Sequence, residues 1–132
     1  MNFTISVQTA CQTEFKEVTR ELQQLVADAD ISEGSLLLYV PHTTAAITIN
    51  ENADPDVVTD MINGLNKLIP LKDNYRHLEG NSAAHIKSSL IGPSEQIIIH
   101  QGKLLLGTWQ GIYFCEFDGP RSRKLHIKLT KD

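Results

Sequence analysis

The chain contains five histidines, and three of them stand in polar segments where a side chain can meet a ligand. His42 follows a proline at the end of a short apolar run, while His77 and His85 enclose a segment of small and polar residues. Neutral imidazoles are common metal ligands, and three of them leave a coordination position open for water or substrate. Their spacing matches no short metal motif, so spacing alone leaves the metal site open. His100 and His126 fit a strand end and a solvated strand face instead.

Hydroxyl and amide side chains stand beside these histidines. Thr43 and Thr44 directly follow the first histidine, and Asn81 and Ser82 stand where a helix is expected to begin. The first N–H groups of a helix have no partners inside the helix, so such a terminus binds anions. The pattern therefore predicts a polar, anion-binding site built from separate segments.

Two arginines follow a turn sequence at residues 118–120. Arg121 and Arg123 alternate around one serine, so both side chains are expected on the same side of the strand that follows. Two guanidinium groups together suit phosphate or carboxylate, although exposed charges beside a turn are an equally good interpretation. Because the net charge is −4, an anion needs a local cation to attract it. We expect Arg121 to face the same pocket as His85 and to bind an anionic group, with Arg123 as the second candidate.

Glu51 is an acidic residue without an evident structural task. Asp54 is the expected N-cap of a helix and Asp56 favours the dipole of its first turn. Glu51 precedes both, so it can act as a general base or orient a histidine. Trp109 lies in a turn between glycines, and a lone tryptophan usually belongs to a core or an interface.

The elements that must position these residues can be predicted from periodicity. Apolar alternation or short apolar runs predict strands at residues 3–7, 35–40, 45–49, 96–100, 103–106, 111–117 and 125–129. Helical spacing predicts helices that begin at Thr13, at Asp54, and at Asn81 or Ser82. Helices gather early and strands late, which favours an α+β fold of one domain, residues 1–132, with a largely antiparallel sheet and two to three helices.

Composition and the absence of certain segments argue against several classes of protein. The net charge of −4 argues against a nucleic-acid binder, which usually has a basic face. No apolar run approaches the roughly 20 residues of a membrane span, and the first residues do not resemble a signal peptide. The two cysteines form no close pair, so a cytoplasmic protein with reduced, structural thiols is expected.

Three blocks of sequence together resemble one family. They are Pro41 to Ala46 continuing through Asn50 to Pro55, then His77 to His85, then Gly107 to Gln110 with Asp118 to Arg123. In this order they are similar to the YjbQ family, described as secondary thiamine-phosphate synthases. The resemblance covers nearly the whole chain, and no motif position departs from it.

The resemblance implies an α+β fold, a homotrimer with sites near subunit contacts, and a metal site at His42, His77 and His85. It implies a weak thiamine-phosphate synthase activity, which joins hydroxymethylpyrimidine diphosphate to thiazole phosphate. The expected cofactor is a divalent metal with zinc as the first candidate, although three imidazoles also suit iron, cobalt, nickel or copper.

The candidate roles follow from residues and resemblance together. Catalytic roles are assigned to Glu51, His42, Asn81 and Trp109. Substrate binding is assigned to Thr43, Thr44, Ser82, Arg121 and Arg123. The expected ligand is a phosphorylated small molecule, with no nucleic acid or membrane partner. The alternative is a trimeric accessory protein that holds a metal or an anion without turnover.

Overall fold

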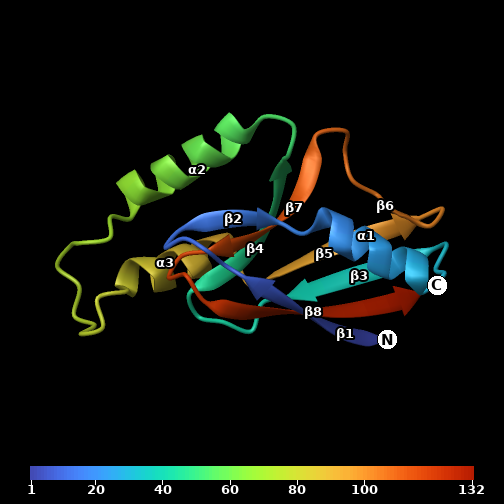
Figure 1. The fold of residues 1–132 in the computed structure, drawn as a ribbon, viewed down its shortest axis with the longest axis horizontal. Coiled ribbons are helices and arrows are strands. Elements are labelled where there is room, and N and C mark those ends of the chain that lie inside the picture. Colours follow the sequence, from blue (N-terminus) through green and yellow to red (C-terminus); the bar gives the residue numbers. More distant parts are fainter.

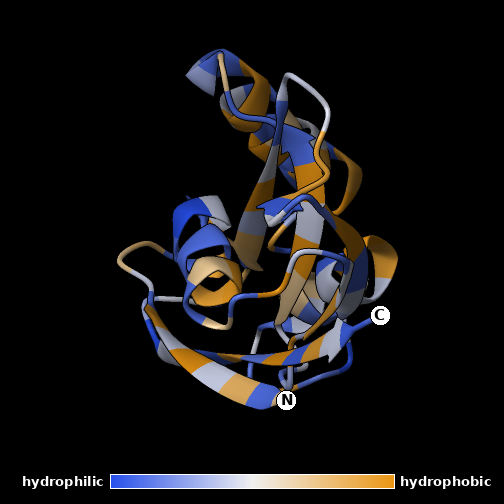
Figure 2. Cartoon of the chain, turned by 90° about the vertical axis from the view of Figure 1, so that its right-hand side faces the viewer, coloured by the Kyte–Doolittle hydropathy of each residue, from blue (hydrophilic) through white to orange (hydrophobic).

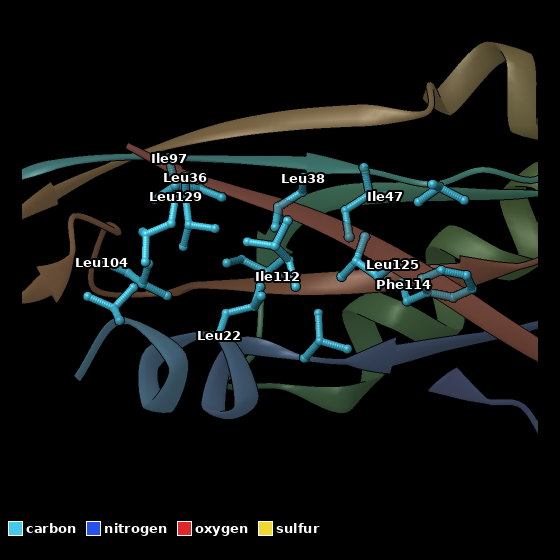
Figure 3. Close-up of a cluster of buried hydrophobic side chains, with 14 of the residues drawn as sticks. Leu22, Leu36, Leu38, Ile47, Ile97, Leu104, Ile112, Phe114, Leu125 and Leu129 are labelled. Atoms are coloured by element: carbon cyan, nitrogen blue, oxygen red, sulfur yellow. The ribbon is translucent and has the colours of Figure 1, made fainter. Parts of the chain in front are cut away.

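The strands of the protein form two antiparallel sheets that face each other across an apolar core (Figures 1 and 3). The structure is a computed structural model and describes all of residues 1–132. The larger sheet has five strands in the order β1-β8-β3-β5-β6, and the smaller has three in the order β2-β7-β4. All pairings are antiparallel, which confirms the predicted α+β class with largely antiparallel strands.

Three helices accompany the eight strands. In chain order the elements are β1 (Asn2–Gln8), β2 (Glu14–Glu17), α1 (Thr19–Asp28), β3 (Gly34–Tyr39), β4 (Ala45–Glu51), α2 (Pro55–Leu68), α3 (Ser82–Ile91), β5 (Ser94–His100), β6 (Lys103–Leu104), β7 (Gln110–Glu116) and β8 (Ser122–Lys131). Most of the predicted strands are confirmed within a few residues.

The core lies between the two sheets and is closed at one end by α1 (Figure 3). Alternate residues of β3 and β8 are buried, and in β8 hydrophobic residues at most of the buried positions alternate with polar ones. Figure 2 shows such bands of hydrophobic and hydrophilic residues along the strands. β7 is the middle strand of the smaller sheet and is buried along nearly its whole length. Burial of each large aliphatic or aromatic side chain contributes about 1.5–3 kcal/mol, so this core holds both sheets in fixed relative positions.

The predicted helix from Thr13 is wrong at its start. The residues from Glu14 to Glu17 form β2, which pairs with β7 and places Phe15 opposite Cys115. The helix begins only at Thr19. Phe15 also packs near the rings of Tyr113 and Phe117, so pairing with a buried strand overrides the helical spacing of the sequence.

Helix α2 begins where it was predicted. The Asp54 side chain accepts a hydrogen bond from the Asp56 N–H at 2.9 Å, and Pro55 occupies the first turn. No residue of this helix is buried, although one side of it is apolar. Figure 1 shows α2 running along one side of the sheets rather than being enclosed by them. None of the three helices combines the length and the apolar character needed to span a membrane.

Replacement of Gly34 by alanine is expected to destabilise the sheet. An added Cβ would lie 2.1 Å from the backbone oxygen of Thr130 on the neighbouring strand. Forcing atoms into a packed region costs about 1–3 kcal/mol, which urea unfolding would measure as a lower free energy of unfolding. Gly64→Ala is the matched control, since nothing lies within 4 Å of its added Cβ and it sits inside α2. That change should stabilise the protein by about 0.5–1 kcal/mol, and a similar loss in both variants would contradict the argument.

Candidate functional site

Parts of the three sequence blocks converge on one polar pocket of about 490 Å³. Its walls come from the loop after β3, the segment that leads into α3, and the turn between β7 and β8. Figure 1 shows this turn close to α3, and a hydrogen bond between Asn81 and Asp118 joins the two segments. None of the lining residues is hydrophobic; they are Pro41, His42, Thr43, Thr44, His77, Glu79, Asn81, His85, Asp118, Arg121 and Arg123.

Two of the three candidate histidines lie side by side in this pocket. The rings of His77 and His85 are 5.5 Å apart between centroids and perpendicular to each other. His77 belongs to the loop before α3 and is about half exposed, whereas His85 lies in the first turns of α3. Glu79 lies near the first ring, with a carboxylate oxygen 3.9 Å from His77 Nε2. Helix and loop thus present two imidazoles to the same space.

His42 is held differently from this pair. Its Nε2 accepts a hydrogen bond from the backbone N–H of Lys124 at 2.9 Å. Burial lowers the pKa of His42, and the nearby Arg123 guanidinium lowers it further. The ring is therefore neutral at physiological pH, and its proton is on Nδ1 because Nε2 is the acceptor.

The donor set fits a divalent metal in part. Imidazole nitrogens are suitable ligands, and the neighbouring rings of His77 and His85 can both contribute one. The structure shows no group of three or more histidine, cysteine, aspartate or glutamate side chains arranged to hold a metal ion. His42 does not fit as the third ligand in this arrangement, since the lone pair of its neutral ring is already engaged.

Beneath the pocket lies a buried ion pair. Arg123 donates from Nε to Glu116 Oε1 at 2.9 Å and from Nη2 to Glu116 Oε2 at 2.5 Å. Its Nη2 also donates to the Thr44 hydroxyl at 2.7 Å, and Glu116 accepts further bonds from the Thr9 hydroxyl and the Asp118 N–H. Both charged side chains are almost completely buried. Nη1 of Arg123 makes no hydrogen bond within the chain, so this arginine offers the N–H donors of one nitrogen to the pocket.

These bonds set the charge of Glu116. Burial by itself raises the pKa of this carboxyl, but the bonds from Arg123, Thr9 and the Asp118 N–H outweigh it. The pKa of Glu116 is consequently below its usual value of 4.5. The carboxylate stays ionised at neutral pH and keeps the Arg123 guanidinium in one orientation.

Arg121 lies at the rim of the same pocket as His85. It donates from Nε to the backbone oxygen of Asp118 at 2.7 Å and from Nη2 to Asp118 Oδ2 at 3.0 Å. This contact uses one edge of the guanidinium and leaves the Nη1–Nη2 edge open. Asn81 donates to the same Oδ2 at 2.9 Å, and its own Oδ1 is buried without a partner. A side chain fixed in this way offers an acceptor to a ligand or a water molecule.

Not every predicted site residue reaches this pocket. Ser82 lines a neighbouring pocket of about 400 Å³ that also includes His77 and His85. Glu51 and Trp109 lie at the far end of β4 and β7, where Glu51 pairs with Gln110. Glu51 follows Thr44 by seven positions, which corresponds to roughly 20 Å along a strand. Within one chain these two residues are therefore separated from the histidines.

Sequence reasoning missed three acidic residues of the site. Asp118 was interpreted only as part of a turn, although it links Arg121 to Asn81. Glu79 gave no separate signal. Glu116 stands between buried neighbours in a strand-like run, and an acidic residue in such a run signals a paired charge, because an unpaired buried charge is too costly.

Comparison with known proteins supports one assignment. A family model described as UPF0047 protein YjbQ-like matches residues 3–132. The chain is 50% identical to UPF0047 protein YugU of Bacillus subtilis over 96% of both chains, and 52% identical to UPF0047 protein MJ1081 of Methanocaldococcus jannaschii over 100% of this chain and 96% of that one.

Solved structures agree with this result. A YjbQ/UPF0047 protein of Clostridium acetobutylicum matches with a TM-score of 0.94 and 52% identity, covering 96% of this chain and 98% of that one. A protein of unknown function from Sulfolobus solfataricus matches with a TM-score of 0.95 and 30% identity, covering 100% and 97%. The chain therefore belongs to the YjbQ/UPF0047 family.

Proposed function

We propose that the protein is a small-molecule enzyme that joins hydroxymethylpyrimidine diphosphate to thiazole phosphate, a thiamine-phosphate synthase activity that is secondary to another reaction on phosphorylated substrates. The observation that carries the proposal is the pocket itself, which has no hydrophobic lining residue and includes three histidines and two arginines. Such a lining suits a highly charged, phosphorylated ligand, because fixed cations and N–H donors replace the water around its oxygens.

In the proposed reaction the thiazole nitrogen forms a bond to the methylene carbon of the pyrimidine. The bond from that carbon to the diphosphate oxygen breaks, and its electron pair leaves with pyrophosphate. In this proposal Arg121 would hold the diphosphate through its open guanidinium edge, and the start of α3, whose N-cap Asn81 lines the same pocket, would add a favourable helix dipole. The guanidinium would stabilise the negative charge that grows on the leaving group.

The chain also supplies a place for a metal in this scheme. His77 and His85 would hold a divalent ion, for which zinc is the first candidate. When bound, such an ion would neutralise charge on phosphate oxygens.

The assembly that we propose is a homotrimer. Helix α2 has an apolar side but no buried residue, Leu68 is 72% exposed, and Trp109 is 63% exposed. Aromatic and aliphatic side chains of this kind are typical of interface cores. Glu51 and Trp109 lie far from the pocket within one chain, so they can serve as catalytic residues only if a neighbouring subunit brings them to it.

Light scattering at micromolar protein concentration is expected to give three times the chain mass of 14.7 kDa. The physical reason is that burial of the exposed apolar side chains favours association. A monomer under these conditions would contradict the assembly. It would also remove Glu51 and Trp109 from the proposed site.

The function is tested by incubating the purified protein with both substrates and measuring thiamine phosphate and pyrophosphate. Turnover that depends on added zinc and is lost in His85→Ala supports the proposal. His100→Ala is the matched control, because this histidine is exposed and pairs with Glu33 away from the pocket. Binding of phosphate and zinc without turnover would instead identify the trimeric accessory protein that was the alternative.

A further inference from the structure

His42 occupies a special position at the edge of the larger sheet. The ladder between β3 and β8 ends at the pair Tyr39 and His126, and the chain then turns away through Pro41. The N–H of Lys124 lies beyond this last pair, so β3 gives it no backbone partner. The His42 side chain supplies the acceptor through Nε2 at 2.9 Å.

This bond decides which chemistry His42 can perform. A neutral imidazole has one nitrogen with a free lone pair and one that carries a proton. Because the Lys124 N–H occupies the lone pair of Nε2, the proton is on Nδ1, and no lone pair is left for a metal ion. A metal bond through Nε2 would have to break this hydrogen bond to the Lys124 N–H.

The surroundings make His42 suitable for another task. The ring lines the polar pocket together with Arg123, whose Nη1 is its only free nitrogen. Both side chains are held by hydrogen bonds: the arginine by Glu116 at the end of β7, and the histidine by the Lys124 N–H of β8. Each therefore has one nitrogen whose N–H donors have no partner in the chain, Nη1 of Arg123 and Nδ1 of His42.

We propose that His42 is not a metal ligand but a neutral hydrogen-bond donor, which binds an oxygen of the phosphorylated substrate through Nδ1–H. The metal ligands that this chain supplies are then His77 and His85 alone. The inference rests on the proposed function for the identity of the ligand, and it changes the role of one of the three histidines. His42 recognises the substrate, while the pair on the other side of the pocket binds the ion.

The first test measures zinc and inorganic phosphate binding by calorimetry. His42→Asn should keep the zinc affinity within about threefold, whereas His77→Ala or His85→Ala should weaken it by roughly tenfold or more, as loss of groups at metal sites does. His42→Ala should weaken phosphate binding by about tenfold, the usual effect of losing one hydrogen bond to a charged group. His42→Asn should restore it, because the asparagine amide lies where Nδ1 was, and His100→Ala should change neither affinity.

The second test reads the tautomer directly. Long-range proton–nitrogen NMR of the wild-type protein at neutral pH should show a protonated Nδ1 and an unprotonated Nε2 for His42. The opposite tautomer overturns the inference, and so does a loss of zinc in His42→Asn as large as that in His85→Ala. A wild-type protein that binds neither zinc nor phosphate contradicts the proposed function instead, and the NMR spectrum then still shows whether His42 is the Nδ1–H donor.

Discussion

Arg123→Leu is expected to lower the free energy of unfolding by about 3–5 kcal/mol at neutral pH, the usual effect of removing one partner of a buried ion pair. The variant leaves the Glu116 carboxylate completely buried, with only the Thr9 hydroxyl and the Asp118 N–H as donors. It also removes the donor to the Thr44 hydroxyl at the base of the pocket. Urea unfolding followed by circular dichroism measures this change.

Arg121→Leu is the matched control for this prediction. Its pair with Asp118 is about half exposed on the arginine side, and exposed pairs contribute roughly 0–1 kcal/mol. The double variant Arg123→Leu with Glu116→Leu should regain part of the loss, because it removes both buried charges. Equal destabilisation by the two arginine variants would show that burial of the pair does not matter.

The effect of Arg123→Leu should also depend on pH. In the wild type the pKa of Glu116 is lowered below 4.5. The ionised carboxylate therefore stabilises the folded protein above pH 4.5, and this stabilisation is lost as the pH falls through the lowered pKa. Without the guanidinium, burial dominates and the pKa of Glu116 rises relative to the wild type. The difference in unfolding free energy should therefore be largest near neutral pH and become smaller below pH 4.5. A difference that stays constant with pH would exclude this linkage.

Arg121→Lys is expected to weaken the binding of a phosphorylated ligand about ten- to a hundredfold, since a hydrogen bond to a charged group contributes roughly 1.5–3 kcal/mol. Arg121 uses one guanidinium edge to hold Asp118 and leaves the other open. A lysine cannot bind Asp118 and a phosphate in this planar arrangement. Calorimetry with thiamine phosphate and with inorganic phosphate measures the loss.

Arg20→Lys serves as the control for Arg121→Lys, because Arg20 is exposed on α1 and does not line the polar pocket. Zinc content and the unfolding transition should remain unchanged in both variants. Equal phosphate affinities for wild type and Arg121→Lys would show that this arginine is only a solvated surface charge.

The sequence by itself determined the features that depend on local rules. Asp54 and Pro55 start α2 where predicted, because capping needs only neighbouring atoms. The alternation of apolar residues in β8 fixed which side of that strand enters the core. The order of the three motif blocks identified the family. Eleven residues line the polar pocket, and eight of them had been proposed as site residues from the sequence.

Local rules failed where a distant partner decided the outcome. The spacing from Phe15 onward favours a helix, yet pairing with β7 makes residues 14–17 a strand. The sequence placed the two arginines on the same side of β8 and ranked Arg121 first, but it could not show which of them is buried. Arg123 is buried because Glu116, seven residues earlier, meets it beneath the pocket, whereas Arg121 remains at the rim with Asp118.

The roles of the histidines also depended on tertiary structure. Spacing could not show that His77 and His85 lie with their rings 5.5 Å apart, since a loop and a helix must fold together to bring them there. Nor could it show that the Lys124 N–H occupies Nε2 of His42, a contact that joins residues 82 positions apart. The sequence determined which groups are available for chemistry, and only the tertiary structure decided which of their lone pairs and N–H donors remain free, because hydrogen bonds between distant segments occupy the others.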